Sequence, residues 1–193
     1  MFRKWWQTGM HEQQDHCPQR RLMLKTMAGG AALMAMPGLS QANIPRSQRA
    51  LSFIHTHTGE RLSLAYKAGS SYIPQSIAKI SYLMRDFYNG QVHQIDTGLL
   101  DVLWQLQTNL KSHQPFEIIS AYRSPATNNM LRKHSTGVAK DSMHLRGQAI
   151  DIRLPGVPLA HVRDAALDLK KGGVGYYPAS DFVHVDTGRV RHW

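Results

Sequence analysis

The stretch Met143-His144-Leu145-Arg146-Gly147-Gln148-Ala149-Ile150-Asp151-Ile152-Arg153 contains the strongest structural signal in the chain. His144 lies directly before an apolar run with strand character, residues 148–153, and Asp151 lies within that run. Gly147 permits the chain to turn between them, because glycine adopts backbone conformations closed to other residues. This arrangement can bring an imidazole and a carboxylate together on one cation.

A second histidine follows in the next strong strand pattern, Phe182–Asp186. Residues two apart in a strand share a face, so His184 and Asp186 are expected to point the same way. Two histidines, one carboxylate and an open position for water match a catalytic zinc site. Histidines in strands are also common as ordinary core or surface groups, and the spacing alone leaves both interpretations open.

The rest of the pattern predicts an α+β fold, with a small antiparallel sheet that carries this site and packs against helices. Leu99, Leu103, Leu106 and Leu110 recur at spacings of four, three and four, which is one face of a helix. The expected helices are residues 75–88, 98–111, 126–133 and 158–171. The expected strands are residues 51–54, 61–66, 116–122, 148–153, 175–177 and 182–186.

Length and composition indicate one globular domain with some chain to spare: 193 residues, 42% hydrophobic and 19% charged. They exclude a disordered chain, a collagen-like fibre and a disulfide-stapled mini-protein. Lys and Arg total 23 against 13 Asp and Glu, for a formal charge of +10. The first 42 residues hold only five of the bases, so the remainder stays basic, which suits a polymer rich in carboxylates.

Residues 1–42 have the layout of an export signal. Arg20-Arg21 precede Met23-Leu24-Lys25, as in twin-arginine signals, and a short glycine-rich apolar run follows over 26–39. Ser40-Gln41-Ala42 supplies the small residues of a cleavage site. We expect export to the periplasm by the twin-arginine machinery, cleavage after Ala42, and a single catalytic domain over 43–193. An amphipathic membrane anchor and an ordinary signal without paired arginines are the alternatives.

The only cysteine, Cys17, lies inside this signal, so the domain has no thiolate nucleophile, disulfide or cysteine zinc ligand. Any metal chemistry must use histidines and carboxylates. His55 and His57 lie beside a predicted turn with no carboxylate near them in sequence. We expect them on a solvated hairpin. A Ser-His-Asp triad drawn through Ser124 lacks the glycine pattern of a nucleophile elbow.

Three short motifs resemble those of the LAS zinc peptidases, which include D-Ala-D-Ala carboxypeptidases and murein endopeptidases. Residues 142–151 resemble the signature Ser-x-His-x-x-Gly-x-Ala-x-Asp, residues 120–124 resemble Ser-x-Tyr-Arg-Ser, and residues 181–184 resemble the closing element, an acid three residues before a histidine. Residues 172–177 and the ending 191–193 extend the similarity to the murein endopeptidase branch over nearly all of 43–193.

The resemblance implies one Zn²⁺ per chain, held by His144, Asp151 and His184. It implies that Asp181 is the general base that takes a proton from the water. Many relatives carry Glu at that position, so the shorter Asp is a departure. Asp186, on the same strand face as His184, is a rival for the base or for a role in orienting an imidazole.

The resemblance also implies a substrate-binding set around the zinc. Arg123 would polarise the scissile carbonyl or hold a substrate carboxylate, because its guanidinium is planar and always charged. Tyr122 belongs to the same motif, and Ser142 would support the loop that carries His144 through a local hydrogen bond.

The function implied is a zinc-dependent murein endopeptidase that hydrolyses cross-links between peptidoglycan stem peptides in the periplasm. We expect a monomer with no membrane attachment in its mature form. Nucleic-acid binding is disfavoured because no stripe of basic and aromatic residues is present. The alternatives are a D,D- or L,D-carboxypeptidase that trims stem peptides, and a non-catalytic peptidoglycan-binding module.

Overall fold

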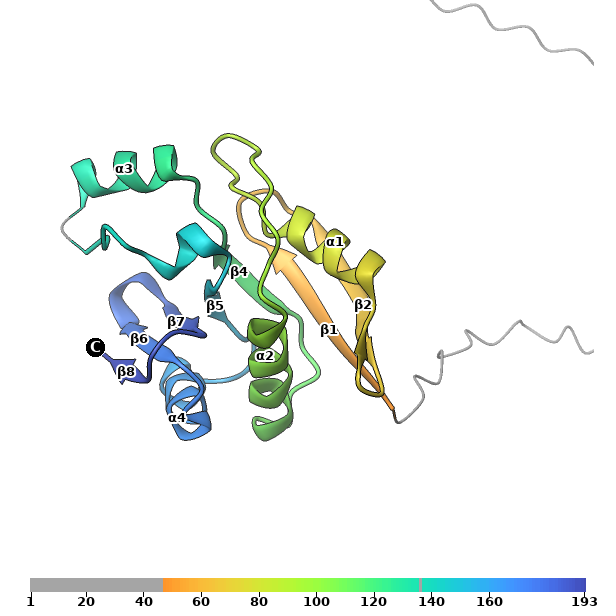
Figure 1. Ribbon diagram of the computed structural model, residues 1–193. Helices are drawn as coiled ribbons and strands as arrows, with labels where there is room; N and C mark the ends of the chain where they lie inside the picture. Colours follow the sequence, from red (N-terminus) through yellow and green to blue (C-terminus); the bar gives the residue numbers. More distant parts are fainter. Residues whose placement is uncertain (1–46, 136) are drawn as a thin grey trace, which may run out of the picture. The chain divides into compact units, whose positions relative to one another are not determined.

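The computed structural model describes residues 47–135 and 137–193 (Figure 1). The expected leader, residues 1–42, lies outside the described residues. In chain order the elements are β1 (Gln48–His55), β2 (Arg61–Ala68), β3 (Ser71–Tyr72), α1 (Pro74–Leu83), α2 (Thr97–Asn109), β4 (Phe116–Ser120), α3 (Pro125–His134), η1 (a 3₁₀ turn, Met143–Arg146), β5 (Ala149–Arg153), α4 (Leu159–Leu169), β6 (Gly173–Tyr177), η2 (Pro178–Ser180), β7 (Phe182–Asp186) and β8 (Arg191–His192).

The strands form one sheet of eight in the order β3-β2-β1-β4-β5-β7-β6-β8. The α+β class is confirmed, but the expectation of a small antiparallel sheet is wrong. Two of the neighbouring pairs, β1 with β4 and β6 with β8, are parallel. A parallel pair needs a long crossover, and the chain makes one through β2, α1 and α2 before β4 returns beside β1.

The two faces of the sheet have different chemistry. On β5 and β7 the buried residues Ile150, Ile152, Val183 and Val185 alternate with polar ones and belong to the same hydrophobic core as α2 and α4. Figure 1 shows these two helices side by side against the sheet. Because side chains alternate between faces, Asp151, His184 and Asp186 point to the opposite face. The site is therefore built on a rigid sheet backed by the core.

Helix α1 is shorter than the sequence pattern predicts, since it ends at Leu83 rather than residue 88. The buried Asp86 carboxylate accepts hydrogen bonds from the backbone N–H of Tyr88 (3.0 Å) and of Ser124 (2.8 Å). Together with the backbone hydrogen bonds that join Asp86 to Gly90 and Gln91, these bonds hold residues 86–91 in a turn. No helix in the described ranges combines the length and the apolar character needed to cross a membrane.

The expectation that His55 lies on a solvated hairpin is wrong. His55 is only 1% exposed, because it ends β1 against the ring of Phe87, whose centroid lies 5.6 Å away. His57 stays exposed and stacks on the same ring at 4.2 Å. The turn after β1 is thus covered by the segment that follows α1, which local sequence does not reveal.

Candidate metal centre

Asp151 and His184 face each other across two neighbouring strands. They are directly opposite in the antiparallel register of β5 and β7, and residues in that position share a face of the sheet. Nδ1 of His184 lies 2.8 Å from Oδ1 of Asp151. Both residues are more than nine-tenths buried. The alternating pattern of two core strands therefore places a carboxylate beside an imidazole on the face away from the helices.

The third member, His144, lies on the short turn η1 rather than in a strand. Ser142 begins this turn, and its hydroxyl accepts a hydrogen bond from the His144 N–H at 3.3 Å, which confirms the expected local bond. Gly147 ends the turn with φ +63°, and a Cβ there would lie 2.6 Å from the carbonyl oxygen of Gln94. Only glycine fits both the left-handed backbone and the close approach.

The three side chains present one atom each to a common point. The spacings are 2.8 Å (Asp151 Oδ1 to His184 Nδ1), 3.2 Å (His144 Nε2 to His184 Nδ1) and 3.3 Å (His144 Nε2 to Asp151 Oδ1). Tetrahedral bonds of about 2.0–2.1 Å would separate ligand atoms by about 3.3 Å. Among the described residues these three form the cluster of His and carboxylate groups able to hold a metal ion.

In each histidine of the cluster, the ring nitrogen that points away from Asp151 has a hydrogen-bond partner of its own. Nδ1 of His144 lies 2.5 Å from the carbonyl oxygen of Ala121, and Nε2 of His184 lies 2.9 Å from Oδ2 of Asp186. A carbonyl and a carboxylate only accept hydrogen bonds, so these nitrogens are the donors. In the neutral imidazole whose proton is on that outer nitrogen, the nitrogen that faces Asp151 carries the lone pair that a metal ligand needs. Three converging lone pairs are the donor set for a cation.

The ionisation of the cluster follows from burial and pairing. Burial lowers the pKa of His144, and the neighbouring Asp151 opposes this only in part. Burial would also lower the pKa of His184, but its hydrogen bonds to Asp151 and Asp186 outweigh burial and raise it. Burial alone would raise the pKa of Asp151, yet the two histidines hold it well below its ordinary value. Asp151 is therefore ionised at neutral pH, as a metal ligand should be.

Asp186 is turned toward the back of His184. Besides the His184 ring it accepts hydrogen bonds from the backbone N–H of Gly173 (2.9 Å) and Gly188 (2.8 Å) and from both terminal nitrogens of Arg191 (2.6 and 3.0 Å). These donors hold the pKa of Asp186 well below its ordinary value although burial opposes them. Such a saturated carboxylate fixes the orientation of an imidazole.

Arg123 lies beside the cluster and joins it to the neighbouring strand. Its Nε donates to the hydroxyl of Ser120 (2.9 Å), and Nη2 donates to Oδ2 of Asp151 (2.6 Å) and lies 3.2 Å from Nε2 of His144. The next residue, Ser124, is held by Asp86 and begins helix α3. A guanidinium is thus fixed within reach of any group bound at the three ligands.

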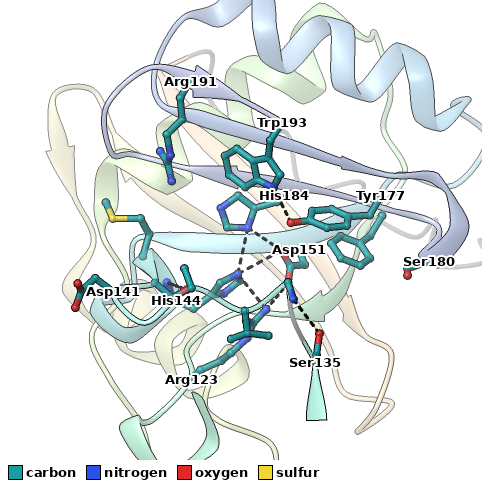
Figure 2. Close-up of a pocket in the computed structure, with 16 residues that line it drawn as sticks. Arg123, Ser135, Asp141, His144, Asp151, Tyr177, Ser180, His184, Arg191 and Trp193 are labelled. Atoms are coloured by element: carbon teal, nitrogen blue, oxygen red, sulfur yellow. Dashed lines mark hydrogen bonds and ion pairs between the residues drawn. The ribbon is translucent and has the colours of Figure 1, made fainter. Parts of the chain in front are cut away.

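The cluster opens into a cavity of about 510 Å³. Figure 2 shows Arg123 on one side of His144, Asp151 and His184, and the rings of Tyr177 and Trp193 on the other. The cavity is lined by Arg123, Ser135, Gly137, Val138, Ala139, Asp141, Ser142, Met143, His144, Asp151, Tyr177, Ser180, Phe182, His184, Arg191 and Trp193. A bound cation would therefore be reachable by a ligand from solvent.

Two residues predicted for the site lie elsewhere. Asp181 is 62% exposed in its side chain and pairs with Arg153 at 2.8 Å, although its neighbours Ser180 and Phe182 line the cavity. Arg153 attracts it because β5 carries this arginine opposite the start of β7, two residues beyond Asp151. Tyr122 is buried and stacks on His93, with ring centroids 4.9 Å apart, so it packs in the protein rather than lining the cavity.

Sequence reasoning did not assign the aromatic and basic cavity residues Tyr177, Phe182, Arg191 and Trp193 to the site. The ending 191–193 contributed only to the resemblance. Their place depends on β8 pairing with β6, and a two-residue strand leaves no periodic signal in the sequence.

The chain is similar over most of its length to known peptidoglycan endopeptidases. The family model described as "Peptidoglycan L,D-endopeptidase MepK" matches residues 43–193. The protein of that name from Escherichia coli K12 is 43% identical over 175 residues, which cover 91% of this chain and 96% of the relative. The "Probable peptidoglycan L,D-endopeptidase MepK" of Haemophilus influenzae is 43% identical over 180 residues, 93% of this chain and 96% of the relative.

The predicted resemblance to the murein endopeptidase branch is confirmed, and it covers the whole segment that carries the cluster and its cavity. The chain belongs to the M15 peptidase family described as peptidoglycan L,D-endopeptidase MepK.

Proposed function

We propose that this chain is a zinc-dependent endopeptidase that hydrolyses peptidoglycan cross-links, and that it acts on the bond between an L- and a D-configured centre of two stem peptides. The observation that carries the proposal is the convergence of three lone-pair atoms in an open cavity, in a chain of this peptidase family. The choice of an L,D bond is supported by the names of relatives 43% identical over most of the chain.

Zinc suits the donor set, because two imidazole nitrogens and one carboxylate oxygen are borderline ligands typical of catalytic zinc. His144, Asp151 and His184 would hold it, one ion per chain. When bound, zinc supplies Lewis acidity and lowers the pKa of water to about 7. All three candidate ligands and Arg123 come from one chain, so a monomer would hold a complete site.

Arg123 would bind the carbonyl oxygen of the scissile amide. Its guanidinium is held by Ser120 and Asp151 in a fixed orientation. A preorganised cation of this kind stabilises the negative charge that develops on the carbonyl oxygen when water attacks. The carbonyl carbon would then lie between Arg123 and the ligand cluster.

Asp181 would take the proton from the attacking water and pass it to the leaving amine. Its exposed ion pair with Arg153 is weak, about 0–1 kcal/mol, so the carboxylate can leave it and turn into the cavity beside Ser180 and Phe182. Asp186 would have to abandon a full set of buried hydrogen bonds to do the same. We therefore favour Asp181 as the base and Asp186 as the residue that orients His184.

Variants test this assignment. Asp181→Asn should keep its zinc and lose about 10²–10⁴-fold in turnover, because an amide cannot accept the proton. Arg153→Gln is the matched control: it removes the partner of Asp181 without removing the base and should keep its turnover. An Asp181→Asn enzyme with full turnover, beside an inactive Asp186→Asn enzyme that retains zinc, would make Asp186 the base.

The central experiment uses the purified domain 43–193 and defined muropeptide dimers joined by L,D or D,D cross-links. We expect the L,D dimer to be split into monomers, chelation to abolish the reaction, and added Zn²⁺ to restore it. Release of a single terminal amino acid instead of monomers would indicate a carboxypeptidase. Binding of the dimer with no cleavage by the zinc-loaded protein would indicate a binding module.

We also propose that residues 1–42 are a twin-arginine export signal cleaved after Ala42, which delivers a folded enzyme to the periplasm. The family match begins at residue 43, which supports a boundary there. Replacing Arg20 and Arg21 with Lys should abolish export of a folded reporter fused to this segment. Efficient export of the Lys-Lys version would exclude the twin-arginine route.

A further inference from the structure

A single row of residues crosses four strands through the ligand cluster. Ser120 on β4 is opposite Asp151, Asp151 is opposite His184, and His184 is opposite Gly175 on β6. Trp193 extends the row, since its backbone follows β8 and bonds to both neighbours of Gly175, the carbonyl of Val174 (3.2 Å) and the N–H of Tyr176 (3.1 Å). The last residue of the chain is therefore beside a ligand histidine.

Gly175 provides the space that Trp193 occupies. A Cβ at this position would lie 2.7 Å from Cε2 of Trp193 and 2.8 Å from Cε2 of Tyr177. Because β6 has no side chain here, the indole lies over the strand, with its ring centroid 5.2 Å from that of His184. Any larger residue at 175 would push both aromatic rings away from the cluster.

The rings are locked to one another as well as to the sheet. The indole Nε1 of Trp193 donates to the hydroxyl oxygen of Tyr177 at 2.6 Å, and Tyr177 stacks on Phe182 at 4.6 Å. All three rings line the cavity, and Trp193 is 49% exposed. The arrangement is an aromatic platform, Tyr177-Phe182-Trp193, on the side of the cluster away from Arg123 (Figure 2).

The platform offers two kinds of contact. Its ring faces suit an aliphatic chain, which loses contact with water when it packs on them. The hydroxyl oxygen of Tyr177 already accepts from Trp193, and in the described parts of the chain its own proton has no acceptor, so it can donate to a carboxylate or carbonyl. Arg191 lines the same side of the cavity, 5.0 Å from the Trp193 ring centroid, but its terminal nitrogens are bonded to Asp186.

We propose that this platform binds the aliphatic arm of the diaminopimelate residue that supplies the scissile carbonyl, with Tyr177 donating to the polar end of the arm. This inference rests on the proposed function, and it identifies the side chain that the site recognises. A diamino diacid combines an apolar chain with an ionised end, and the platform combines ring faces with the hydroxyl donor of Tyr177. The platform would therefore set substrate preference without taking part in bond cleavage.

The test compares two synthetic L,D-linked dimers, one with diaminopimelate at that position and one with alanine in its place. On the diaminopimelate dimer, Trp193→Ala should raise KM about tenfold with kcat nearly unchanged, because it removes binding common to substrate and transition state. On the alanine dimer, wild type and Trp193→Ala should have the same KM. Tyr177 is not in contact with His144, Asp151 or His184. Tyr177→Phe should therefore show the same substrate dependence, with a smaller rise in KM.

Trp193→Phe should restore most of the affinity, and Tyr82→Ala, which removes an aromatic residue 55% exposed on α1 outside the cavity, is the matched control. Zinc content is measured for every variant. Equal losses on both dimers in Trp193→Ala and Tyr177→Phe would overturn the platform and leave a structural role. A wild-type enzyme that cleaves neither dimer would instead refute the proposed function.

Discussion

Asp101 and Asp151 are two shielded carboxylates with opposite surroundings. Asp101, on α2, accepts hydrogen bonds from Tyr66 (2.8 Å), Lys67 (2.8 Å), Tyr72 (2.9 Å) and Arg49 (3.1 Å). Each of these groups is a donor, so every lone pair of the carboxylate is satisfied by the protein. The cluster ties α2 to β1, β2 and β3.

Oδ1 of Asp151 instead faces one nitrogen of each histidine, which carries a lone pair in the tautomer able to bind a metal ion, and Oδ2 accepts from Arg123. The partners of Asp101 are all donors supplied by the protein, whereas Asp151 and the two histidines direct one potential ligand atom each to a common point. The comparison shows that the partners around a shielded carboxylate separate a structural one from a candidate metal ligand.

The largest effect is expected when one of the three proposed metal ligands is removed. His144→Ala should lose its zinc and reduce muropeptide cleavage by about 10³-fold or more, because the metal contributes several kcal/mol to the transition state. Elemental analysis and dimer cleavage measure the two effects. Full zinc occupancy in this variant would overturn the ligand assignment.

A smaller effect is expected from the cation beside the cluster. Arg123→Ala should lower kcat by about 10²–10³-fold with zinc content unchanged, because it removes charge stabilisation at the carbonyl oxygen. Ser120→Ala, which removes only the hydroxyl that holds Nε, is the matched control and should lose much less. Loss of zinc in Arg123→Ala would indicate that Arg123 mainly supports Asp151.

Asp186, which bonds to Nε2 of His184, should affect zinc affinity more than turnover. Asp186→Asn should weaken zinc binding about 10–100-fold, because the amide is a poorer acceptor for the imidazole N–H. Competition with a chelator of known affinity measures this, and saturating zinc should restore most of the turnover. Unchanged affinity would remove the orienting role.

The smallest effect on activity is expected at the structural carboxylate. Asp101→Asn should lower the free energy of unfolding by about 1–3 kcal/mol and leave zinc content and turnover unchanged. Burial would raise the pKa of Asp101, but its hydrogen bonds with Lys67, Tyr66 and Tyr72 lower it. A carboxylate with a lowered pKa stabilises the fold above its unfolded-state pKa of about 3.9.

The stability difference between wild type and Asp101→Asn should therefore be complete at pH 7 and shrink as the pH falls below about 4. Urea unfolding at several pH values measures it. A difference that grew on acidification would contradict the sign of the shift. Loss of zinc at neutral pH in Asp101→Asn would show that the two clusters are coupled.

Much of the fold could be predicted from local sequence. The leucines at 99, 103 and 106 mark α2, and the alternation in 182–186 marks β7, because both patterns depend on neighbours within one turn or two residues. The end of α1 could not be predicted, since it depends on Asp86 bonding to Ser124, which is distant in sequence. The order and parallel pairs of the sheet also depend on contacts between distant segments.

The sequence by itself determined the kinds of ligand atom and their spacing, because His144 and Asp151 belong to one turn and strand, and His184 and Asp186 to one strand face. Only the tertiary structure decided which carboxylate bonds to the His184 ring, where the Asp181 side chain points, and which residue, Trp193, lies beside His184. The physical reason is that strand register and side-chain pairing across the sheet are set by the whole core. Short-range patterns in a single strand contain no information about its partner.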